Sequence, residues 1–353
     1  MAVVLCACLL CPSMAAAKQI PNRGLFVSMI EEPYALSDQK HARQLIDFAK
    51  KSHIRTLFVQ IYRSGDFHPS CSRRPNDAFA RFIHDAHGAG IRVHAWMNLM
   101  SLGGNEKAPI LQKYGPDILT RNTSKKENLQ EYKIDNQYFL EPGDPRVRKE
   151  TVATVSEVLR AYPDLDGIQF DYLRYPDSHP FYGHTRVNLE NYLKTTGHSA
   201  VETDPAWKNW KRAQVTELLK ELIRKTRMIR PKIQISTTGA LPYVRAYHEA
   251  FQDWPSWLNS KLVEFVTVMD YSPDPAEFHK FLSDAKTRIT TPRKMNVAVG
   301  AYKLVHSPEI FEKEFRICES ARCGQCVAFY YGSFLENPAL SAALMVSSDY
   351  HGK

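Results

Sequence analysis

Polar and charged residues gather in one short segment, residues 166–176, which reads D-G-I-Q-F-D-Y-L-R-Y-P. Apolar residues alternate with these polar ones at the centre of the segment, which predicts a buried strand. In a strand, alternate side chains point to opposite faces. The residues that suit a helix-covered face are Ile168, Phe170 and Tyr172. Gln169 and Asp171 then point the other way, with Asp171 at the strand end. A carboxylate among apolar groups is costly without a partner or a task, so Asp171 either caps a loop, pairs with Arg174 or Arg63, or is catalytic.

Other predicted strand ends carry similar residues. The candidates for substrate binding are Gln60, Arg63, Asp66, His94, Trp96, Asn98, Arg174, Tyr271 and Tyr331. In the H-A-W-M-N segment, the same alternation turns its polar and aromatic members, His94, Trp96 and Asn98, to one side. With a carboxylate as acid, base or nucleophile at the anomeric centre of a sugar, Trp96, Tyr271 and Tyr331 would stack on sugar rings. One such aromatic residue is more typical of core packing, but their shared position favours a sugar site.

The second carboxyl group of such a site is less clear. Most glycosidases use two, about 5 Å apart for retention of configuration or about 6.5–9.5 Å apart for inversion. We expect Asp270 to be the second group, although it points toward the helices if Met269 and Tyr271 face inward. The alternatives are Asp66, which ranks next, and Glu31 and Glu32.

Eight apolar, β-branched segments alternate with helical patterns along the chain. They are Gly24–Glu31, Thr56–Tyr62, Arg92–Asn98, Gly167–Tyr172, Lys232–Thr238, Phe265–Tyr271, Asn296–Ala301 and Cys326–Tyr331. Strict alternation of this kind predicts an α/β fold, a closed eight-stranded parallel β/α (TIM) barrel forming a single domain over residues 18–353. Catalytic residues of such barrels lie at the C-terminal ends of the strands. Residues 100–143, predicted to be a long irregular loop, would lie on the same face.

Three helix starts are marked by a proline at the first helical position. These helices are expected from Asp144-Pro145 to about Tyr162, from Asp274-Pro275 to about Lys286 and from Ser307-Pro308 to about Ser320.

Several of these segments together resemble a known family. They are residues 24–34, V-Q-I-Y-R-S-G-D, H-A-W-M-N, E-P-G-D-P at 141–145, the D-G-I-Q-F-D-Y-L-R-Y-P segment and Trp210-Lys211-Arg212-x-x-Val215. In this order they are similar to the bacterial glycosyl-hydrolase-like barrel family, which includes glycosidases acting on denuded peptidoglycan. The resemblance covers nearly the whole chain after residue 17. It implies a glycosidase barrel in which Asp171 is a catalytic carboxylate.

A more distant likeness is to chitinase-type barrels, whose fourth strand reads D-G-x-D-x-D-x-E and whose sixth reads M-x-Y. The residues that fit are Asp166, Asp171, Met269 and Tyr271. Leu173 stands where that family has its general-acid glutamate, and Gln169 replaces the middle aspartate. The usual substrate-assisted chemistry of chitinases is therefore not expected here.

Residues 1–17 are typical of a secretory signal peptide. An apolar run from Ala2 to Leu10 precedes Pro12 and the small residues of an A-x-A cleavage site at 15–17. The run is shorter than the roughly 20 residues that a membrane-spanning helix needs, and no later segment is apolar enough to span a membrane. We expect a secreted or periplasmic protein; a lipid anchor through Leu5-Cys6-Ala7-Cys8 is the less favoured alternative.

Four cysteines remain after removal of the signal segment, namely Cys71, Cys318, Cys323 and Cys326. The C-x4-C-x2-C spacing of the last three lacks a nearby fourth metal ligand. In an oxidising compartment this pattern favours a disulfide within residues 318–326, without fixing which cysteines pair.

The chain has 46 Lys and Arg against 38 Asp and Glu, a net charge of +8. This excess favours attraction to a polyanion such as an acidic cell-wall glycan. Nucleic acid is not expected, because the basic residues are spread over amphipathic helices.

The sequence therefore predicts an exported, monomeric glycoside hydrolase acting on a polysaccharide, with no cofactor and no metal. One alternative is a carbohydrate-binding barrel without catalysis. Another is a metal-dependent polysaccharide deacetylase or other hydrolase, which needs clustered His and Asp ligands. The histidines do not suggest such a cluster, since His84 and His87 are expected on an outer helix and His179 and His184 in a loop.

Overall fold

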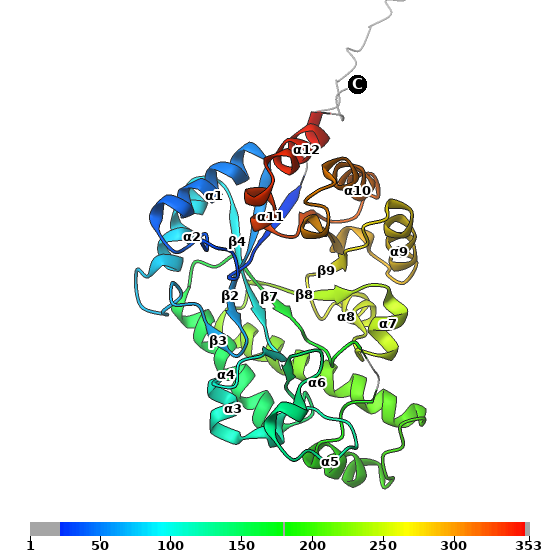
Figure 1. The fold of residues 1–353 in the computed structure, drawn as a ribbon. Coiled ribbons are helices and arrows are strands. Elements are labelled where there is room, and N and C mark those ends of the chain that lie inside the picture. The colour runs from blue at the N-terminus through cyan, green and yellow to red at the C-terminus, as the bar shows by residue number, and fades with distance from the viewer. Residues whose placement is uncertain (1–21, 179–180, 350–353) are drawn as a thin grey trace, which may run out of the picture.

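The computed structural model describes residues 22–178 and 181–349, so the expected signal segment at 1–17 lies outside the described residues. The barrel strands are β1 (Arg23–Val27), β2 (Ile54–Arg63), β4 (Arg92–Asn98), β7 (Gly167–Asp171), β8 (Gln234–Ala240), β9 (Phe265–Asp270), β10 (Met295–Val299) and β11 (Cys326–Ala328). Neighbouring strands are parallel, and β1 pairs with both β2 and β11, which closes the barrel (Figure 1). The predicted single-domain TIM barrel is confirmed.

The ends of the strands differ from the predicted ones by a few residues. The largest differences are in the first and last strands, where β1 ends at Val27 and not at Glu31, and β11 ends at Ala328 and not at Tyr331. A helix begins at Tyr331 directly after the last strand. An apolar run does not by itself separate the end of a strand from the helix that follows it.

Helices cover the outside of the barrel (Figure 1). They are α1 (Gln39–Lys51), α2 (Ala78–Gly88), α4 (Pro145–Ala161), α6 (Pro205–Ile229), α7 (Tyr243–His248), α8 (Trp254–Asn259), α9 (Pro275–Thr287), α10 (Pro308–Ser320), α11 (Tyr331–Glu336) and α12 (Pro338–Asp349). The three predicted Pro-marked helices are present. Asp144 and Asp274 cap two of them, since each side chain accepts a hydrogen bond from a backbone N–H in the first turn, a contact that stabilises a helix by about 1 kcal/mol.

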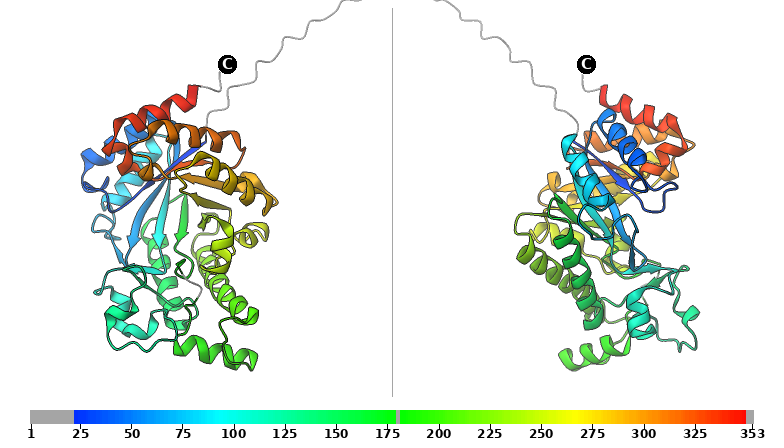
Figure 2. Two further views of the ribbon diagram at one scale, coloured as in Figure 1. Left: turned by 45° about the vertical axis from the view of Figure 1, so that its right-hand side comes forward. Right: turned by 90° about the vertical axis from the view of Figure 1, so that its left-hand side faces the viewer.

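Two long connecting segments, called excursions below, follow the C-terminal ends of β4 and β7. Residues 100–143 were expected to be irregular, but they contain the two-stranded sheet of β5 (Ser101–Gly103) and β6 (Tyr138–Phe139) and the helix α3 (Pro109–Tyr114). The second excursion follows β7 and carries α5 (Arg186–Thr196). The two excursions meet, because His184 N–H donates to the carbonyl of Arg121 at 3.0 Å, and α3 and α5 lie at the same side of the barrel (Figure 2).

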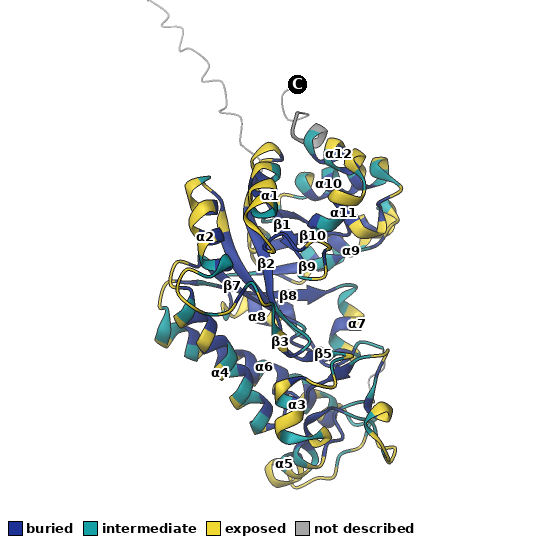
Figure 3. Cartoon of the chain, turned by 60° about the vertical axis from the view of Figure 1, so that its left-hand side comes forward, coloured by how far each residue is buried: buried dark blue, intermediate teal, exposed yellow. Residues whose placement is uncertain are grey.

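The barrel has two hydrophobic clusters. The interior holds Phe26, Phe58, Trp96, Ala298 and Val327, and the larger outer cluster lies between the strands and the helices. Most residues of the barrel strands are buried, while the exposed residues lie mainly on the outward faces of the helices and in loops (Figure 3). Side chains therefore fill the barrel interior, so that a ligand of the barrel would bind at one of its mouths.

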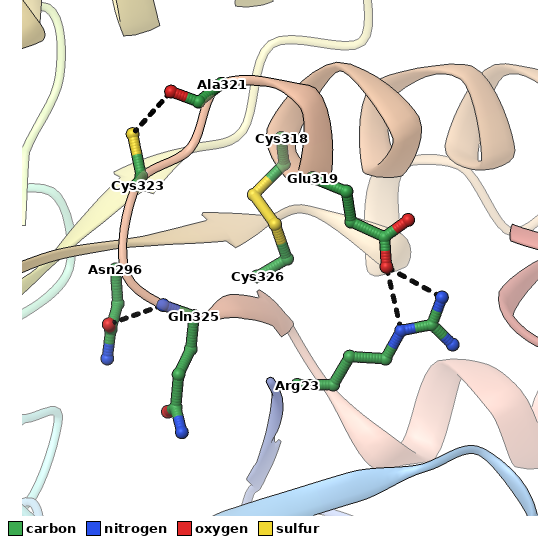
Figure 4. Close-up of a disulfide and its surroundings, with 8 residues drawn as sticks. All are labelled: Arg23, Asn296, Cys318, Glu319, Ala321, Cys323, Gln325 and Cys326. Atoms are coloured by element: carbon green, nitrogen blue, oxygen red, sulfur yellow. Dashed lines mark hydrogen bonds and ion pairs between the residues drawn. A yellow bond between two sulfur atoms is a disulfide. The ribbon is translucent and has the colours of Figure 1, made fainter. Parts of the chain in front are cut away.

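A disulfide joins Cys318 at the end of α10 to Cys326 at the start of β11. Beside it, the Nη2 of Arg23 on β1 lies 2.7 Å from a carboxylate oxygen of Glu319 (Figure 4). Cys323 is free and its thiol points toward the carbonyl of Ala321. The expected disulfide within 318–326 is confirmed, and it lies where β1 and β11 close the barrel.

Among the described helices, none combines the length and the apolar character that crossing a membrane requires.

Candidate active site

Asp171 is the last residue of β7 and is 3% exposed. Its Oδ2 accepts a hydrogen bond from the indole Nε1 of Trp96 at 2.8 Å. Its Oδ1 accepts from the hydroxyl of Thr238 at 2.5 Å and from the backbone N–H of Tyr172 at 2.7 Å. Three donors therefore fix the orientation of this carboxylate.

Strand pairing brings these groups together. Asn98 on β4 lies opposite Asp171 on β7, and Trp96 lies opposite Gln169. Gln169 points into the barrel, where its Oε1 accepts hydrogen bonds from the hydroxyls of Ser236 and Thr267 at 3.2 and 3.1 Å. The predicted inward direction of Gln169 and Asp171 is therefore confirmed.

Tyr172 is an exception to the predicted alternation. It was assigned to the helix-facing side, but it lines a cavity at the mouth of the barrel. Its φ of 54° lies in the left-handed region, so the strand ends at Asp171 and the alternation no longer applies. The turn brings the chain back over the barrel, and the backbone N–H of Arg174 donates to the carbonyl of Tyr172 at 2.8 Å.

The cavity above Asp171 measures about 680 Å³. Of the residues predicted to form the site, those that line it are Arg63, Trp96, Asn98, Asp171, Arg174, Asp270 and Tyr271. They come from β2, β4, β7 and β9 and from the turns that follow these strands. The structure thus brings together residues that are more than 200 positions apart in the sequence.

Aromatic rings form one wall of the cavity. Tyr271 stacks on Phe329 with ring centroids 4.9 Å apart, and Tyr302 meets both rings edge-on. The hydroxyl of Tyr271 is buried and has no hydrogen-bond partner among the described residues. Burial and the nearby charge of Asp171 raise the pKa of Tyr271 well above its usual value, so its O–H remains a donor.

Gln60 does not line the cavity but lies directly behind it, completely buried. Its Oε1 accepts a hydrogen bond from the hydroxyl of Ser28 at 2.9 Å, and its Nε2 donates to Oδ1 of Asn98 at 3.2 Å. Ser28 and Asn98 both line the cavity. Gln60 is therefore placed to position these two side chains, and its expected contact with the substrate is corrected to an indirect role.

Three other predicted residues lie away from the cavity. His94 is deep inside the barrel beside Phe58 and Phe265, and burial lowers its pKa to about 3, which leaves the ring neutral. Asp66 lines a separate cavity of about 210 Å³ outside β2. Tyr331 is 4% exposed and packs on Phe48 in the outer cluster.

The reasons for these three differences are geometric. His94 has the predicted inward direction, but it lies four residues before Asn98 on β4 and therefore deeper in the barrel than the mouth. Asp66 belongs to β3 (Asp66–Phe67), which folds back antiparallel on the end of β2 and carries the side chain outward. Tyr331 begins α11, so the cavity wall is formed by the preceding Phe329 and Tyr330.

The carboxyl group of Asp270 faces the helix layer. Val266 and Val268, four and two residues earlier, belong to the outer cluster, whereas Thr267 contacts Gln169 inside the barrel. Both carboxyl oxygens of Asp270 are buried, and no side chain of the described residues donates a hydrogen bond to them. Burial raises the pKa of Asp270 to about 8; the backbone N–H of Ser272 opposes this shift, and the charges of Glu314 and Glu277 add to it. The structure therefore does not direct this carboxyl group at Asp171.

Two further acidic residues line the cavity, Asp177 and Glu277. Asp177 is half-buried in the turn after β7, and its carboxylate lies 3.4 Å from Arg245. Glu277 is exposed at the start of α9 and accepts a hydrogen bond from the hydroxyl of Ser272 at 2.6 Å. Glu31, an alternative from the sequence, is buried behind the wall, where its Oε1 accepts from the N–H groups of Ser28 and Gly332.

The sequence reasoning missed several residues of the site. They are Ser28, Tyr172, Asp177, Thr238, Arg245, Tyr302, Phe329 and Tyr330. Thr238 closes a predicted strand, and its alternation with Ser236 on the interior face is a signal that could have found it. The others follow strand ends, where strand alternation gives no direction.

In residues 22–178 and 181–349, no group of three or more His, Cys, Asp or Glu side chains is arranged to hold a metal ion.

The fold and site define the class of the protein as a β/α barrel with a carboxylate at the floor of an aromatic-walled cavity. Solved structures of the same fold include the catalytic domain of β-amylase from Paenibacillus polymyxa, with a TM-score of 0.63 and 10% identity over 94% of this chain and 100% of that one. Another is α-L-fucosidase isoenzyme 2 from Paenibacillus thiaminolyticus, with a TM-score of 0.58 and 13% identity over 93% of this chain and 49% of that one. At such identities the likeness establishes the fold alone.

The chain belongs to the family "Glycosyl hydrolase-like 10", whose model matches residues 22–317. Relatives include glycosyl hydrolase DigH of Escherichia coli strain K12, 23% identical over 68% of this chain and 57% of that protein. Glycosyl hydrolase YngK of Bacillus subtilis strain 168 is 22% identical over 65% of this chain and 48% of that protein. This chain therefore matches only about half of the length of these relatives.

Proposed function

We propose that this protein is a glycoside hydrolase that cleaves a polysaccharide, with Asp171 as its catalytic carboxylate. The observation that carries the proposal is the position of Asp171, held by three donors at the floor of a cavity of about 680 Å³ at the C-terminal ends of the strands. Membership of a glycosyl hydrolase-like family and the names of the relatives support it.

Asp171 suits the chemistry of glycoside cleavage. The anomeric carbon gains positive charge as the glycosidic bond breaks, and an ionised carboxylate beside it stabilises that charge. The hydrogen bonds from Trp96 and Thr238 hold the carboxylate in a fixed orientation before the substrate arrives. The wall of Tyr271, Tyr302 and Phe329 offers faces and edges on which sugar rings pack.

Asp177 is the carboxyl group that we propose as the second catalytic residue. It lines the cavity, is half-buried and lies on the turn that follows Asp171 at the end of β7. Asp270, the residue expected from the sequence, would have to turn its side chain from the helix layer into the cavity to take this role. Asp66 lies in the separate, smaller cavity.

The proposed location is outside the cytoplasm, either secreted or periplasmic, after removal of residues 1–17. The disulfide between Cys318 and Cys326 supports this location, since disulfides persist in oxidising compartments. A cell-wall glycan is the proposed substrate source, which the net charge of +8 favours. We propose a monomer, because the cavity is complete within one chain.

The test is release of new reducing ends from a panel of glycans by the full chain. The panel contains peptidoglycan strands freed of peptide, uronic-acid polymers, xylan and a neutral glucan. We expect cleavage of at least one of them, and a loss of about 10²- to 10³-fold in Asp171→Asn, as when one charge-stabilising group is removed from an active site. Asp164→Asn, an exposed position near the start of the same strand, is the matched control and should retain full activity.

The alternative of a binding barrel without catalysis makes a different prediction. It requires that the wild-type chain binds a glycan of the panel, as measured by calorimetry, yet releases no reducing ends from any of them. An Asp171→Asn variant as active as the wild type would instead contradict the role of Asp171.

A further inference from the structure

Arg174 is a buried cation at the wall of the cavity. It is 7% exposed, and its guanidinium lies over the ring of Tyr172 with Cζ 4.3 Å from the centroid. The turn after Asp171 directs it back over the site, since the backbone N–H of Arg174 donates to the carbonyl of Tyr172. Its side chain therefore lies beside the carboxylate proposed to be catalytic.

This guanidinium lacks the partners that a buried cation usually has. Its Nε and Nη1 are buried and have no hydrogen-bond acceptor among the described residues. None of the ion pairs found within the described part of the chain includes Arg174. Both carboxylate oxygens of Asp171 are already bonded to Trp96, Thr238 and the N–H of Tyr172. A charge buried without a bonded partner is costly, which indicates that the partner is a ligand.

Electrostatics keep this arginine charged despite its burial. Burial lowers the pKa of Arg174, but Tyr172, Asp177, Asp171 and Tyr271 raise it to a net value above the usual one. Asp171 and Asp177 thus balance the charge through space, while Nε and Nη1 of Arg174 have no hydrogen-bond acceptor among the described residues. The alternative suggested by the sequence, a direct pair of Arg174 with Asp171, is absent from the ion pairs and hydrogen bonds of the described residues.

The other cations of the cavity differ from Arg174. Arg245 is about half-exposed and lies 3.4 Å from the carboxylates of both Asp177 and Glu249. Lys303 is exposed and Arg63 is half-buried. Among these cations Arg174 is the least hydrated. A ligand therefore displaces the least water from it and gains the most interaction energy from it.

We infer that Arg174 is a specificity-determining residue that binds a carboxylate carried by a sugar next to the cleaved bond. The inference rests on the proposed function and names its substrate class, an acidic glycan. A planar guanidinium binds a carboxylate through charge-assisted hydrogen bonds, which strengthen in a partly dry site. A neutral sugar would leave the buried N–H groups without a charged partner.

The experiment compares each acidic glycan with its own carboxyl-reduced form, in which the carboxylate becomes a primary alcohol and the backbone is unchanged. One pair is a uronic-acid polymer, with the carboxylate on the ring. The other is peptide-free peptidoglycan strands, with the carboxylate on a lactyl ether. For at least one pair we expect wild-type kcat/KM to favour the acidic form by about 10- to 100-fold, the range for a hydrogen bond to a charged group. The pair that shows the effect identifies the source of the carboxylate.

Variants assign the preference to one residue. In Arg174→Gln the ratio of acidic to reduced substrate should fall to about one, and Arg174→Lys should give an intermediate ratio because it keeps the charge but loses the planar geometry. Arg245→Gln removes the same charge from the same cavity and should keep the wild-type ratio. The wild-type ratio should also persist in 1 M salt, where the Debye length of about 3 Å removes the effect of general surface charge.

Four outcomes overturn the inference. They are equal cleavage of both members of each pair by the wild type, an unchanged ratio in Arg174→Gln, an equal loss of ratio in Arg245→Gln, and a preference that disappears in salt. If Arg174→Gln does not fold, the ratio in Arg174→Lys, which keeps the charge, still tests the same residue. Failure to cleave any glycan, acidic or reduced, is a different result, because it contradicts the proposed function itself.

Discussion

The indole N–H of Trp96 donates a hydrogen bond of 2.8 Å to Oδ2 of Asp171, across the pairing of β4 with β7. The ring of Trp96 also packs edge-on against Phe26 inside the barrel. The same side chain thus joins the packed interior to the carboxylate at the mouth. The position of Asp171 depends on how the whole barrel interior is packed, and not only on its own strand.

Replacing Trp96 by phenylalanine should separate these two roles. Trp96→Phe keeps a ring in the interior but removes the donor to Asp171, so we expect kcat to fall by about 10- to 100-fold, the effect of losing one hydrogen bond to a charged group. KM should change little if the bond matters mainly in the transition state. Trp257→Phe is the matched control, since the indole of Trp257 donates to Thr216 in the helix layer. Equal activity of Trp96→Phe and the wild type would contradict a role for this bond.

The disulfide should contribute to stability and not to activity. Cys318 and Cys326 are eight residues apart, and closing a loop of this size stabilises a fold by about 2–3 kcal/mol. Cys318→Ser should therefore lower the melting temperature while leaving glycan cleavage intact, because the bond lies at the start of β11, at the opposite end of the barrel from the site. Cys323→Ser, at the free thiol, should change neither. A larger destabilisation in Cys323→Ser than in Cys318→Ser would indicate a different pairing.

Stability should fall as pH rises from weakly acidic to weakly alkaline conditions. Burial raises the pKa of Asp270 from 3.8 to about 8 and that of Glu314 from 4.5 to about 8. In this interval the unfolded chain ionises both groups and the folded chain does not, so each group lowers the free energy of unfolding by at most about 1.4 kcal/mol per pH unit. Below the ordinary values both states are protonated and this loss is absent; above about 8 it is complete.

Urea unfolding at several pH values between 5 and 9 measures this effect. Asp270→Asn and Glu314→Gln should each flatten the decline, whereas Glu309→Gln, an exposed position on α10, should leave it unchanged. An identical pH profile for the wild type and all three variants would refute the shifted pKa values.

The leaving group tests the proposed role of Asp177. If Asp177 donates a proton to the departing sugar oxygen, Asp177→Asn should cleave a polysaccharide about 10²- to 10⁴-fold more slowly than the wild type, the usual contribution of general acid catalysis. An aryl glycoside with a nitrophenol leaving group needs no protonation and should be cleaved with a much smaller loss. Asp270→Asn is compared on the same two substrates. If Asp270→Asn loses activity on the polysaccharide but not on the aryl glycoside, and Asp177→Asn loses activity on neither, then Asp270 and not Asp177 is the second catalytic residue.

Much of the fold could be predicted from the sequence because its signals are local. The eight apolar segments and the Asp-Pro helix starts depend on neighbouring residues, and the barrel follows from their strict alternation. The inward direction of Asn98, Gln169 and Asp171 also came from the chain alone, because a residue in a regular strand has its direction fixed by the period of two. The family resemblance added the role of Asp171, which remains a proposal.

The tertiary structure decided what happens where the strands end. Tyr172 and Phe329 lie just beyond regular strand, where the backbone turns and alternation no longer gives a direction. The hydrogen bond from Thr238 to Asp171 depends on the register in which β8 pairs with β7. Asp66 points away from the cavity above Asp171 because β3 folds back antiparallel on β2. Only the tertiary structure leaves Nε and Nη1 of Arg174 without an acceptor among the described residues, because other donors already bond to the carboxylate oxygens of Asp171. Local sequence determines which residues form strands and which face each takes, whereas barrel closure determines which side chains meet at the mouth.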